Sequence, residues 1–318
     1  MRRITIPTTD LTVSSVCLGA GSFGSSVSRD DAFALLDAFA AAGGTFLDTA
    51  RIYAVWLPDG ANASERTLGD WLRQTGLRHR MVIATKGAHP DLKTMHISRL
   101  TPQDIAQDVS ESLYHLQTDH IDLFWLHRDD PAVPAGEIID ALNEHIRAGR
   151  LRYLGCSNWT AARIREANTY AQAHGLAGFV ANQPLWSLAE PNREAISDKT
   201  LVIMGAEDYA FHRESGMAAI PFTSQARGYF TKLANGTLKE ADRRQYDSPL
   251  NRERARRAGE LAARHGVSIT AIALSYLTSQ PFPTVPIIGP KTLDQLQDCL
   301  RDIDLRLTPD ELAYLTGN

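Results

Sequence analysis

The sequence predicts a single (β/α)8 barrel with a short N-terminal hairpin, spanning residues 1–318 as one domain. Short apolar runs typical of buried strands alternate with longer amphipathic stretches typical of helices, and the alternation repeats eight times without a break in composition. The competing arrangement is a doubly wound open sheet, which would need a glycine-rich phosphate fingerprint after an early strand. Gly19, Gly21 and Gly24 have the wrong spacing for that fingerprint.

The strands are predicted from short apolar runs bounded by turn residues. Residues 3–6 and 11–13 flank a Pro-Thr-Thr-Asp turn and indicate a small hairpin. The run at residues 121–127 is almost wholly apolar, as a strand buried on both faces requires. The eight barrel strands are expected at residues 15–18, 45–48, 81–86, 121–127, 152–155, 178–182, 217–221 and 284–288.

The helices are predicted from apolar residues at three- and four-residue spacing, together with local start and stop signals. Gly43 and Gly44 end the first helix, Ser64 is the expected N-cap of the second, and Thr101 with Pro102 opens the third. The helices are expected at residues 30–42, 65–72, 103–116, 136–148, 161–174, 200–215, 251–265, 268–279, 292–300 and 309–315.

Composition narrows the possible partners and location. Hydrophobic residues make up 43% of the chain and charged residues 22%, as in ordinary globular proteins, and the net charge of −4 gives no electrostatic case for nucleic acid. Cys17, Cys156 and Cys299 are too few and too scattered for a disulfide framework. The chain contains no apolar leader and no run long enough to cross a membrane. We therefore expect a cytoplasmic protein without a membrane partner, either a monomer or a homo-oligomer.

Polar residues end three consecutive predicted strands. Asp48, Lys86 and His127 hold these positions, and Tyr53 shares the loop that follows Asp48. The carboxyl ends of the strands of a parallel barrel meet at the face that carries the chemistry. A buried ammonium favours ionisation of a neighbouring phenol, a carboxylate keeps that ammonium charged, and a histidine can donate to a carbonyl oxygen.

These four residues together predict proton transfer to or from a carbonyl or alcohol oxygen. Each residue alone has an ordinary structural explanation, as a cap, an ion pair or a packing group, but four at three consecutive strand ends favour a site. None of them is a source of hydride, so reduction would need a redox cofactor.

Short motifs throughout the chain match one family. They include Leu-Asp-Thr-Ala at 47–50, Ser-Glu-Arg-Thr-Leu-Gly at 64–69, Ile-Ala-Thr-Lys at 83–86, Asp-His-Ile-Asp-Leu at 119–123, Leu-His at 126–127, Gly-Arg-Leu-Arg-Tyr-Leu-Gly-Cys-Ser-Asn at 149–158 and Asn-Gln at 182–183. In this order they resemble the aldo-keto reductases, and the resemblance runs from about residue 3 to residue 315. It implies a (β/α)8 barrel that reduces an aldehyde or ketone with NADPH, with Tyr53 as general acid, Lys86 and Asp48 tuning it, and His127 orienting the carbonyl.

The resemblance also implies cofactor-binding positions. Ser157, Asn158 and Gln183 correspond to the groups that hold the nicotinamide carboxamide, and Phe222 to the residue that stacks on its ring. The expected pyrophosphate loop spans residues 223–229 and includes Thr223, Ser224, Gln225, Arg227 and Gly228. The expected 2′-phosphate site comprises Gly289, Lys291, Thr292 and Gln295.

The chain departs from the family pattern at four places. Phe222 replaces the usual Tyr, and the loop at residues 221–228 differs from the usual Tyr-Ser-Pro-Leu. Gln295 aligns with a second basic residue, and Cys299 aligns with an adenine-binding Asn. These differences leave NADH open as an alternative to NADPH.

The substrate is expected at a mouth built from the long loops after the strands. Its candidate residues are Phe23, Trp56, Arg128, Trp159 and Trp186. Aromatic faces with polar neighbours suit a keto-sugar or similar polar carbonyl as well as an arene, so the sequence does not choose between them.

Two other functions are compatible with the same barrel. A non-catalytic NADPH-binding regulatory subunit would share every cofactor-binding feature. A metal-dependent hydrolase would use Asp48, His127 and Asp129 as ligands, but no His-x-His pair follows the first strand and Lys86 would repel the ion.

Overall fold

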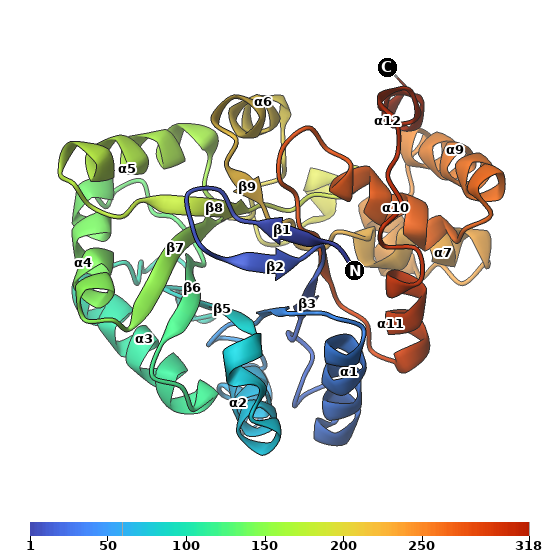
Figure 1. The fold of residues 1–318 in the computed structure, drawn as a ribbon. Helices are drawn as coiled ribbons and strands as arrows, with labels where there is room; N and C mark the ends of the chain where they lie inside the picture. Colours follow the sequence, from blue (N-terminus) through green and yellow to red (C-terminus); the bar gives the residue numbers. More distant parts are fainter. Residues whose placement is uncertain (59, 318) are drawn as a thin grey trace.

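The structure is a computed structural model that describes residues 1–58 and 60–317, and it confirms the predicted barrel with its N-terminal hairpin (Figure 1). The parallel strands are β3 (Cys17–Gly19), β4 (Phe46–Asp48), β5 (Val82–Gly87), β6 (Ile121–Leu126), β7 (Leu151–Ser157), β8 (Phe179–Gln183), β9 (Ala218–Ala219) and β10 (Ile287–Ile288). Their spatial order is β10-β3-β4-β5-β6-β7-β8-β9. The ring closes where Ala219 pairs with Thr284 and accepts a hydrogen bond of 2.9 Å from the N–H of Val285.

Helices surround the strands. The ring consists of α1 (Arg29–Ala41), α2 (Ala63–Thr75), α3 (Pro102–Leu116), α4 (Ala135–Arg147), α5 (Ala161–Ala173), α6 (Ala206–Ser215), α10 (Ile269–Thr278) and α11 (Leu293–Leu300). Further helices, α7 (Tyr229–Ala234), α8 (Glu240–Tyr246), α9 (Pro249–His265) and α12 (Pro309–Thr316), pack beside α10 in a separate apolar cluster. The short helices α7 and α8 were not predicted, and α6 begins at Ala206 rather than near residue 200.

The prediction that Ser64 caps α2 was wrong. Asn62 occupies the N-cap position in a left-handed conformation and makes no side-chain cap. Ser64 is the second residue of α2 and is buried, and its hydroxyl lies 2.6 Å from Oγ1 of Thr49 and donates to the carbonyl of Ala20 at 2.7 Å. Ser64 therefore ties together the loops that follow β3 and β4.

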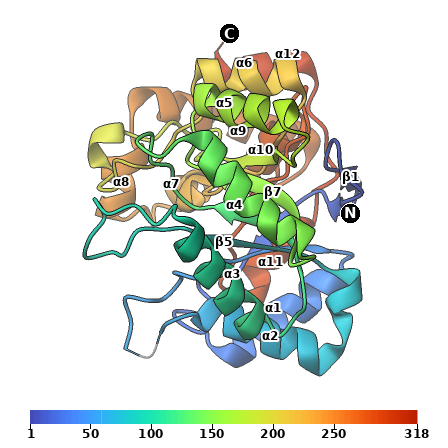
Figure 2. The same ribbon diagram turned by 90° about the vertical axis from the view of Figure 1, so that its left-hand side faces the viewer.

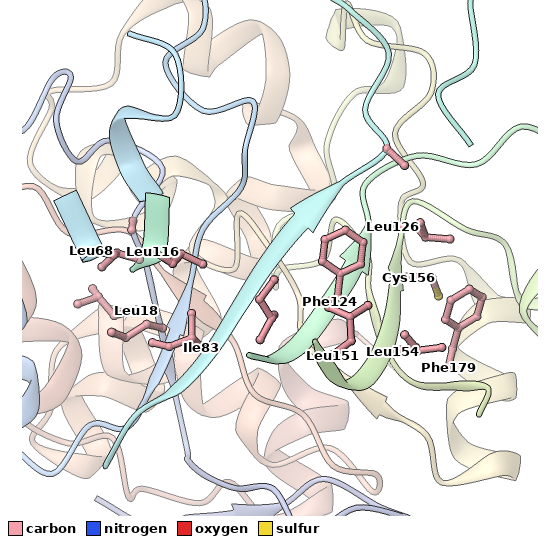
Figure 3. Packing of buried hydrophobic residues seen from close by; sticks show 14 of the residues in the cluster. Leu18, Leu68, Ile83, Leu116, Phe124, Leu126, Leu151, Leu154, Cys156 and Phe179 are labelled. Atoms are coloured by element: carbon pink, nitrogen blue, oxygen red, sulfur yellow. The ribbon is translucent and has the colours of Figure 1, made fainter. Parts of the chain in front are cut away.

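The core has two layers separated by the barrel wall. The outer layer lies between strands and helices, and Figure 3 shows Leu18 of β3, Ile83 of β5, Phe124 of β6 and Leu154 of β7 within it. Fully burying each such side chain contributes about 1.5–3 kcal/mol.

The inner layer fills the barrel and includes Phe46, Leu123 and Trp125. The hairpin of β1 (Arg3–Thr5) and β2 (Thr12–Ser14) adds Ile6 and Val13 to this cluster and so plugs one end of the barrel.

The opposite end of the barrel carries the long loops. Figure 2 shows the hairpin at one end and the loops after β4 and β5 projecting from the other. Successive residues of a strand point to opposite faces, so the inward positions of Phe46 and Ala84 also bring Asp48 and Lys86 into the barrel. No helix within residues 1–58 and 60–317 has the length and apolarity needed to span a bilayer.

Candidate active site

Lys86 is the centre of a polar cluster at the open end of the barrel. Its ammonium pairs with Oδ2 of Asp48, donates to the carbonyl of Thr49 at 2.9 Å and donates to the hydroxyl of Tyr53 at 3.0 Å. Burial alone would lower the pKa of Lys86, but Asp48 and Tyr53 outweigh this effect and raise that pKa above its ordinary value. The structure thus brings three of the four predicted catalytic residues into direct contact.

Two further side chains hold the Asp48 carboxylate. Nε1 of Trp125 and Nε2 of Gln183 each donate to Oδ1 of Asp48 at 3.0 Å. With Lys86 on the other oxygen, the buried charge is fully paired, which offsets its desolvation. Sequence reasoning missed Trp125, because an aromatic residue inside an apolar strand is usually a packing residue. Its position two residues before His127 was the available signal.

His127 is the fourth member of the cluster. Its ring lies edge-on to Tyr53, with ring centroids 6.0 Å apart, and edge-on to His89, with centroids 4.7 Å apart. Burial lowers the pKa of His127 well below its ordinary value, and the charges of Arg128, His89 and Lys86 act in the same direction. The imidazole is therefore neutral at neutral pH, and it keeps one N–H to donate.

Ser157 ends β7 beside this cluster, and Asn158 follows it. Ser157 donates to the carbonyl of Gln183 at 2.9 Å, and the amide of Asn158 donates to the carbonyl of His127 at 3.2 Å. Asn158 has a left-handed conformation, with φ of 62°, and its Oδ1 accepts from the N–H of Val202 at 3.1 Å. Asn158 therefore couples the end of β7 to the His127 backbone and to the loop at residues 184–205.

The predicted pyrophosphate loop is an irregular segment after β9. Phe222 is half-buried at its start, and Ser224 donates to the carbonyl of Ile287 at 2.6 Å, which fixes the loop to β10. Thr223, Ala226 and Arg227 have positive φ values of 53°, 47° and 58°. Non-glycine residues adopt this conformation at a cost of roughly 1–2 kcal/mol each, and such strain concentrates at binding sites.

The side chains of that loop have protein partners. Arg227 pairs through Nε with Asp242 of α8 at 3.2 Å, although its side chain is 55% exposed. Gln225 lies 3.4 Å from the thiol of Cys299 and connects the loop to α11. Gly228 is the left-handed N-cap of α7.

The predicted phosphate site lies where α11 begins. Thr292 is the N-cap of α11, and Gln295 accepts a hydrogen bond of 2.8 Å from the backbone N–H of Lys291. The Lys291 ammonium donates to Ser26 at 3.3 Å, and no carboxylate within the described residues pairs with it. Gly289 is exposed just before this turn. An exposed ammonium beside hydroxyl and backbone donors suits an anion.

Arg128 differs from its predicted role at the substrate mouth. Its guanidinium donates to the carbonyl of His127 at 2.7 Å, to Asp198 at 2.8 Å and to Thr200 at 2.8 Å. All three nitrogens are engaged, so Arg128 holds the loop at residues 184–205 against the end of β6 instead of presenting a charge to a substrate.

Of the four aromatic residues predicted at the mouth, three are buried and one is exposed. Trp159 is completely buried beside Phe179 in the outer core, so it presents no face at the mouth, and Phe23 is buried in the same cluster. Trp186 is buried in a small aromatic cluster with Phe282. Trp56 is 58% exposed on the loop that carries Tyr53.

Exposed apolar side chains concentrate beside the site. Eight large apolar side chains are classed as exposed within the described residues, and five of them lie on the loops after β4 and β5: Val55, Trp56, Leu57, Leu92 and Ile97. We call these five residues the apolar rim. A cavity of about 200 Å³ lies under the second of these loops, between Pro90, Arg99, Arg128 and Thr200. Within the described residues, no group of three or more His, Cys, Asp and Glu side chains is arranged to hold a metal ion.

Comparison with known proteins identifies the family of the chain. Residues 15–317 match the model of the aldo/keto reductase family. The chain belongs to the aldo-keto reductase family. The match covers nearly the whole chain, and the protein is an oxidoreductase.

Individual relatives of this aldo-keto reductase cover almost its full length. It is 32% identical to the aldo-keto reductase ausK of Aspergillus calidoustus, over 98% of this chain and 80% of the relative. It is 29% identical to the norsolorinic acid reductase stcV of Emericella nidulans, over 98% of this chain and 79% of the relative. It is 30% identical to a putative aryl-alcohol dehydrogenase of Saccharomyces cerevisiae, over 98% of this chain and 85% of the relative.

A solved structure shares the fold. The crystal structure of a thermostable aldo-keto reductase with the inhibitor epalrestat superimposes with a TM-score of 0.75 at 21% identity, covering 100% of this chain and 99% of the other.

Proposed function

We propose that this aldo-keto reductase reduces an aldehyde or ketone to an alcohol with a nicotinamide dinucleotide, and that Tyr53 is the general acid. The observation that carries the proposal is the contact of 3.0 Å between the Tyr53 hydroxyl and the buried Lys86 ammonium. A phenol is a weak acid in water, and a neighbouring cation stabilises the phenolate left after proton transfer.

The other residues of the cluster support this proton transfer. Asp48 keeps Lys86 charged, and Trp125 and Gln183 fix the carboxylate so that it does not rotate away from the ammonium. Donors and charges that are already oriented stabilise developing negative charge without reorganising at the moment of reaction.

His127 orients the carbonyl in this proposal. The ring is buried and held between Tyr53 and His89, and its pKa lies well below the ordinary value. A neutral imidazole donates a hydrogen bond to the substrate oxygen without competing as an acid. Tyr53 then transfers its proton to the same oxygen as negative charge develops there.

The chain's donor set fits a dinucleotide phosphate. Lys291 has no carboxylate partner within the described residues, and hydroxyl and backbone donors surround it. Ser157, Asn158, Gln183 and Phe222 would hold the nicotinamide, and the loop at residues 223–228 would hold the pyrophosphate. When bound, the reduced nicotinamide supplies the hydride. Lys291 favours NADPH over NADH, because an ammonium gains a charge-assisted contact with a 2′-phosphate.

The substrate we propose is an aryl or otherwise bulky apolar carbonyl. The apolar rim places exposed apolar side chains on the loop of Tyr53 and on the loop after Lys86. Exposed apolar patches mark binding sites. The names of two relatives, a norsolorinic acid reductase and a putative aryl-alcohol dehydrogenase, point in the same direction.

Paired steady-state and binding measurements on Tyr53→Phe test the proposed function. Wild type should reduce members of an aromatic aldehyde and ketone panel with NADPH, and the variant should lose about 10²-fold or more in kcat. NADPH affinity, measured by fluorescence titration, should stay within about twofold because only the acid is removed. Tyr170→Phe is the matched control, since the Tyr170 hydroxyl is also hydrogen-bonded, to Asp140 at 2.8 Å, but lies on α5 far from the site.

Two results would count against the proposal. Retained turnover in Tyr53→Phe would remove Tyr53 as the acid. NADPH binding by wild type without turnover across the whole carbonyl panel would instead favour the regulatory-subunit alternative.

A further inference from the structure

Asp108 is a buried carboxylate on α3 that joins three segments around the active site. Its Oδ2 accepts a hydrogen bond of 2.7 Å from the N–H of Ala88, directly after β5. Its Oδ1 pairs with Arg99, at the far end of the loop after β5, and with Nε of Arg51 at 3.2 Å. The side chain is 1% exposed, so these interactions replace hydration.

The bond to Ala88 controls the direction of the chain as it leaves β5. Ala88 has a left-handed conformation, with φ of 58°, which is unfavourable for a residue with a Cβ atom. The preceding residue, Gly87, lies so close to α3 that a Cβ atom there would be 2.9 Å from Cβ of Asp108. Asp108 thus fixes the turn between Lys86 and His89, whose ring packs against His127.

The ion pair with Arg51 controls the neighbouring loop. The backbone N–H of Arg51 donates to the carbonyl of Lys86 at 3.1 Å, and its guanidinium also pairs with Glu111 of α3. Arg51 stands between Thr49, whose carbonyl binds the Lys86 ammonium, and Tyr53, whose hydroxyl does the same. Any movement of Arg51 therefore moves both groups that contact Lys86 from this loop.

We propose that Asp108 is a positioning residue for the reaction, because it holds the Tyr53 loop through Arg51 and the His89 segment through Ala88. This role rests on the proposed function of Tyr53. Asp108 touches neither Lys86 nor Tyr53, and it acts through the two segments that carry the acid and its neighbours. Displacing an acid by about 1 Å can cost about 10²-fold in rate.

The chain contains a matched control for this arrangement. Asp122, also buried, accepts a hydrogen bond of 2.9 Å from the N–H of Ile83 and pairs with Arg78 at 2.9 Å and Arg152 at 2.7 Å. Like Asp108, it combines one backbone donor with two arginines, but its donor Ile83 lies near the start of β5, at the hairpin end of the barrel. Replacing a carboxylate of this kind that is only structural should change stability without changing the single-turnover rate.

Four variants separate the two roles: Asp108→Asn, Arg51→Met, Arg51→Lys and the control Asp122→Asn. Four quantities are measured for each: amide hydrogen exchange by mass spectrometry, NADPH affinity by fluorescence, the thermal midpoint, and the single-turnover rate with a carbonyl that wild type reduces. Asp108→Asn and Arg51→Met should speed exchange of the Arg51 and Tyr53 amides about tenfold or more.

The same two variants should slow the single-turnover rate about tenfold or more while NADPH affinity stays within about twofold. Arg51→Lys, which keeps the charge, should recover most of the rate. Asp122→Asn should speed exchange near Ile83 and lower the thermal midpoint while leaving the single-turnover rate within about twofold.

Unchanged exchange of the Arg51 and Tyr53 amides in Asp108→Asn would overturn the positioning role. An equal loss of rate in Asp122→Asn would also overturn it, because general destabilisation would then explain the effect. A wild-type protein that turns over no carbonyl would refute the proposed function separately, and the exchange measurement would still decide whether Asp108 holds the Tyr53 loop.

Discussion

Nζ of Lys86 lies 3.0 Å from the phenol oxygen of Tyr53, although the two residues are 33 positions apart in the chain. The amine is almost completely buried, so its charge is balanced by the Asp48 carboxylate rather than by water. The low dielectric of such a site strengthens the effect of the ammonium on the phenol. The contact joins the end of β5 to the loop that carries the proposed acid.

Replacing Lys86 by Met should lower kcat by about 10²-fold or more, because the phenolate would lose its stabilising cation. The change also leaves Asp48 as a buried charge without its cation, which should destabilise the fold by about 3–5 kcal/mol. The double variant Asp48→Asn/Lys86→Met should recover stability without recovering activity. Thermal unfolding and steady-state kinetics on both proteins measure the two effects.

The control for this prediction is Arg165→Met. Arg165 also pairs with a carboxylate, Glu214, at 3.2 Å, but it lies on α5 and belongs to none of the proposed catalytic or cofactor-binding segments. Its kcat should remain within about twofold of wild type, as for other partly exposed ion pairs. Activity that survives Lys86→Met at full occupancy of cofactor would contradict the proposed role of the ammonium.

Lys291→Ala should weaken NADPH binding by about tenfold or more and change NADH binding by less than about twofold, because only NADPH offers a phosphate to the ammonium. Fluorescence titration with each dinucleotide measures both affinities. Lys239→Ala is the control, since Lys239 is another exposed lysine just before a helix. Equal losses for NADPH and NADH would show that Lys291 does not read the 2′-phosphate.

Trp56→Ser should lower kcat/KM for a bulky aryl ketone by about tenfold, because the loss of apolar contact is worth roughly 1–3 kcal/mol. A small aliphatic aldehyde, which does not reach the apolar rim, should be reduced with nearly unchanged kcat/KM. Leu250→Ser removes a similarly exposed apolar residue on α9 and should affect neither substrate. A uniform loss across substrates of all sizes would argue against Trp56 as a substrate contact.

Glu65→Gln should change how stability depends on pH. Burial raises the pKa of Glu65 to about 7, even though Thr85 donates to the carboxyl at 2.6 Å. Between about pH 4.5 and pH 7, the folded chain holds a proton that the unfolded chain releases, so wild-type stability falls as pH rises, by at most about 3 kcal/mol. The variant lacks this pH-dependent loss of stability. Its thermal midpoint, relative to wild type, should rise from pH 5 to pH 8, and a constant difference would contradict the shifted pKa.

The barrel and the meeting of Asp48, Tyr53 and Lys86 at its open end could be predicted because both follow from local patterns. Period-two alternation fixes which residues of a strand face inward, and a polar residue ending an apolar run marks the strand's carboxyl end. Asp48, Lys86 and His127 were found in this way, and Lys86 indeed contacts Asp48 and Tyr53. No comparable pattern in the sequence identifies the carbonyl substrate.

Features that depend on distant partners could not be predicted. Arg128 was expected to face substrate, but its acceptor Asp198 lies 70 positions later on an irregular loop. The burial of Trp159 depends on Phe179, which comes from the next strand. The helices α7 and α8 are only six and seven residues long, too short for a clear periodic signal, and tertiary packing stabilises them.

The hairpin that plugs the barrel closes one end of the candidate active site. Ile6, Leu11 and Val13 pack at that end with apolar side chains. In the proposed reaction, each molecule exchanged during turnover, including the proton that returns to the phenol, therefore enters between the loops at the opposite end. A ligand bound tightly between those loops would therefore block the exchange of substrate, cofactor and protons together.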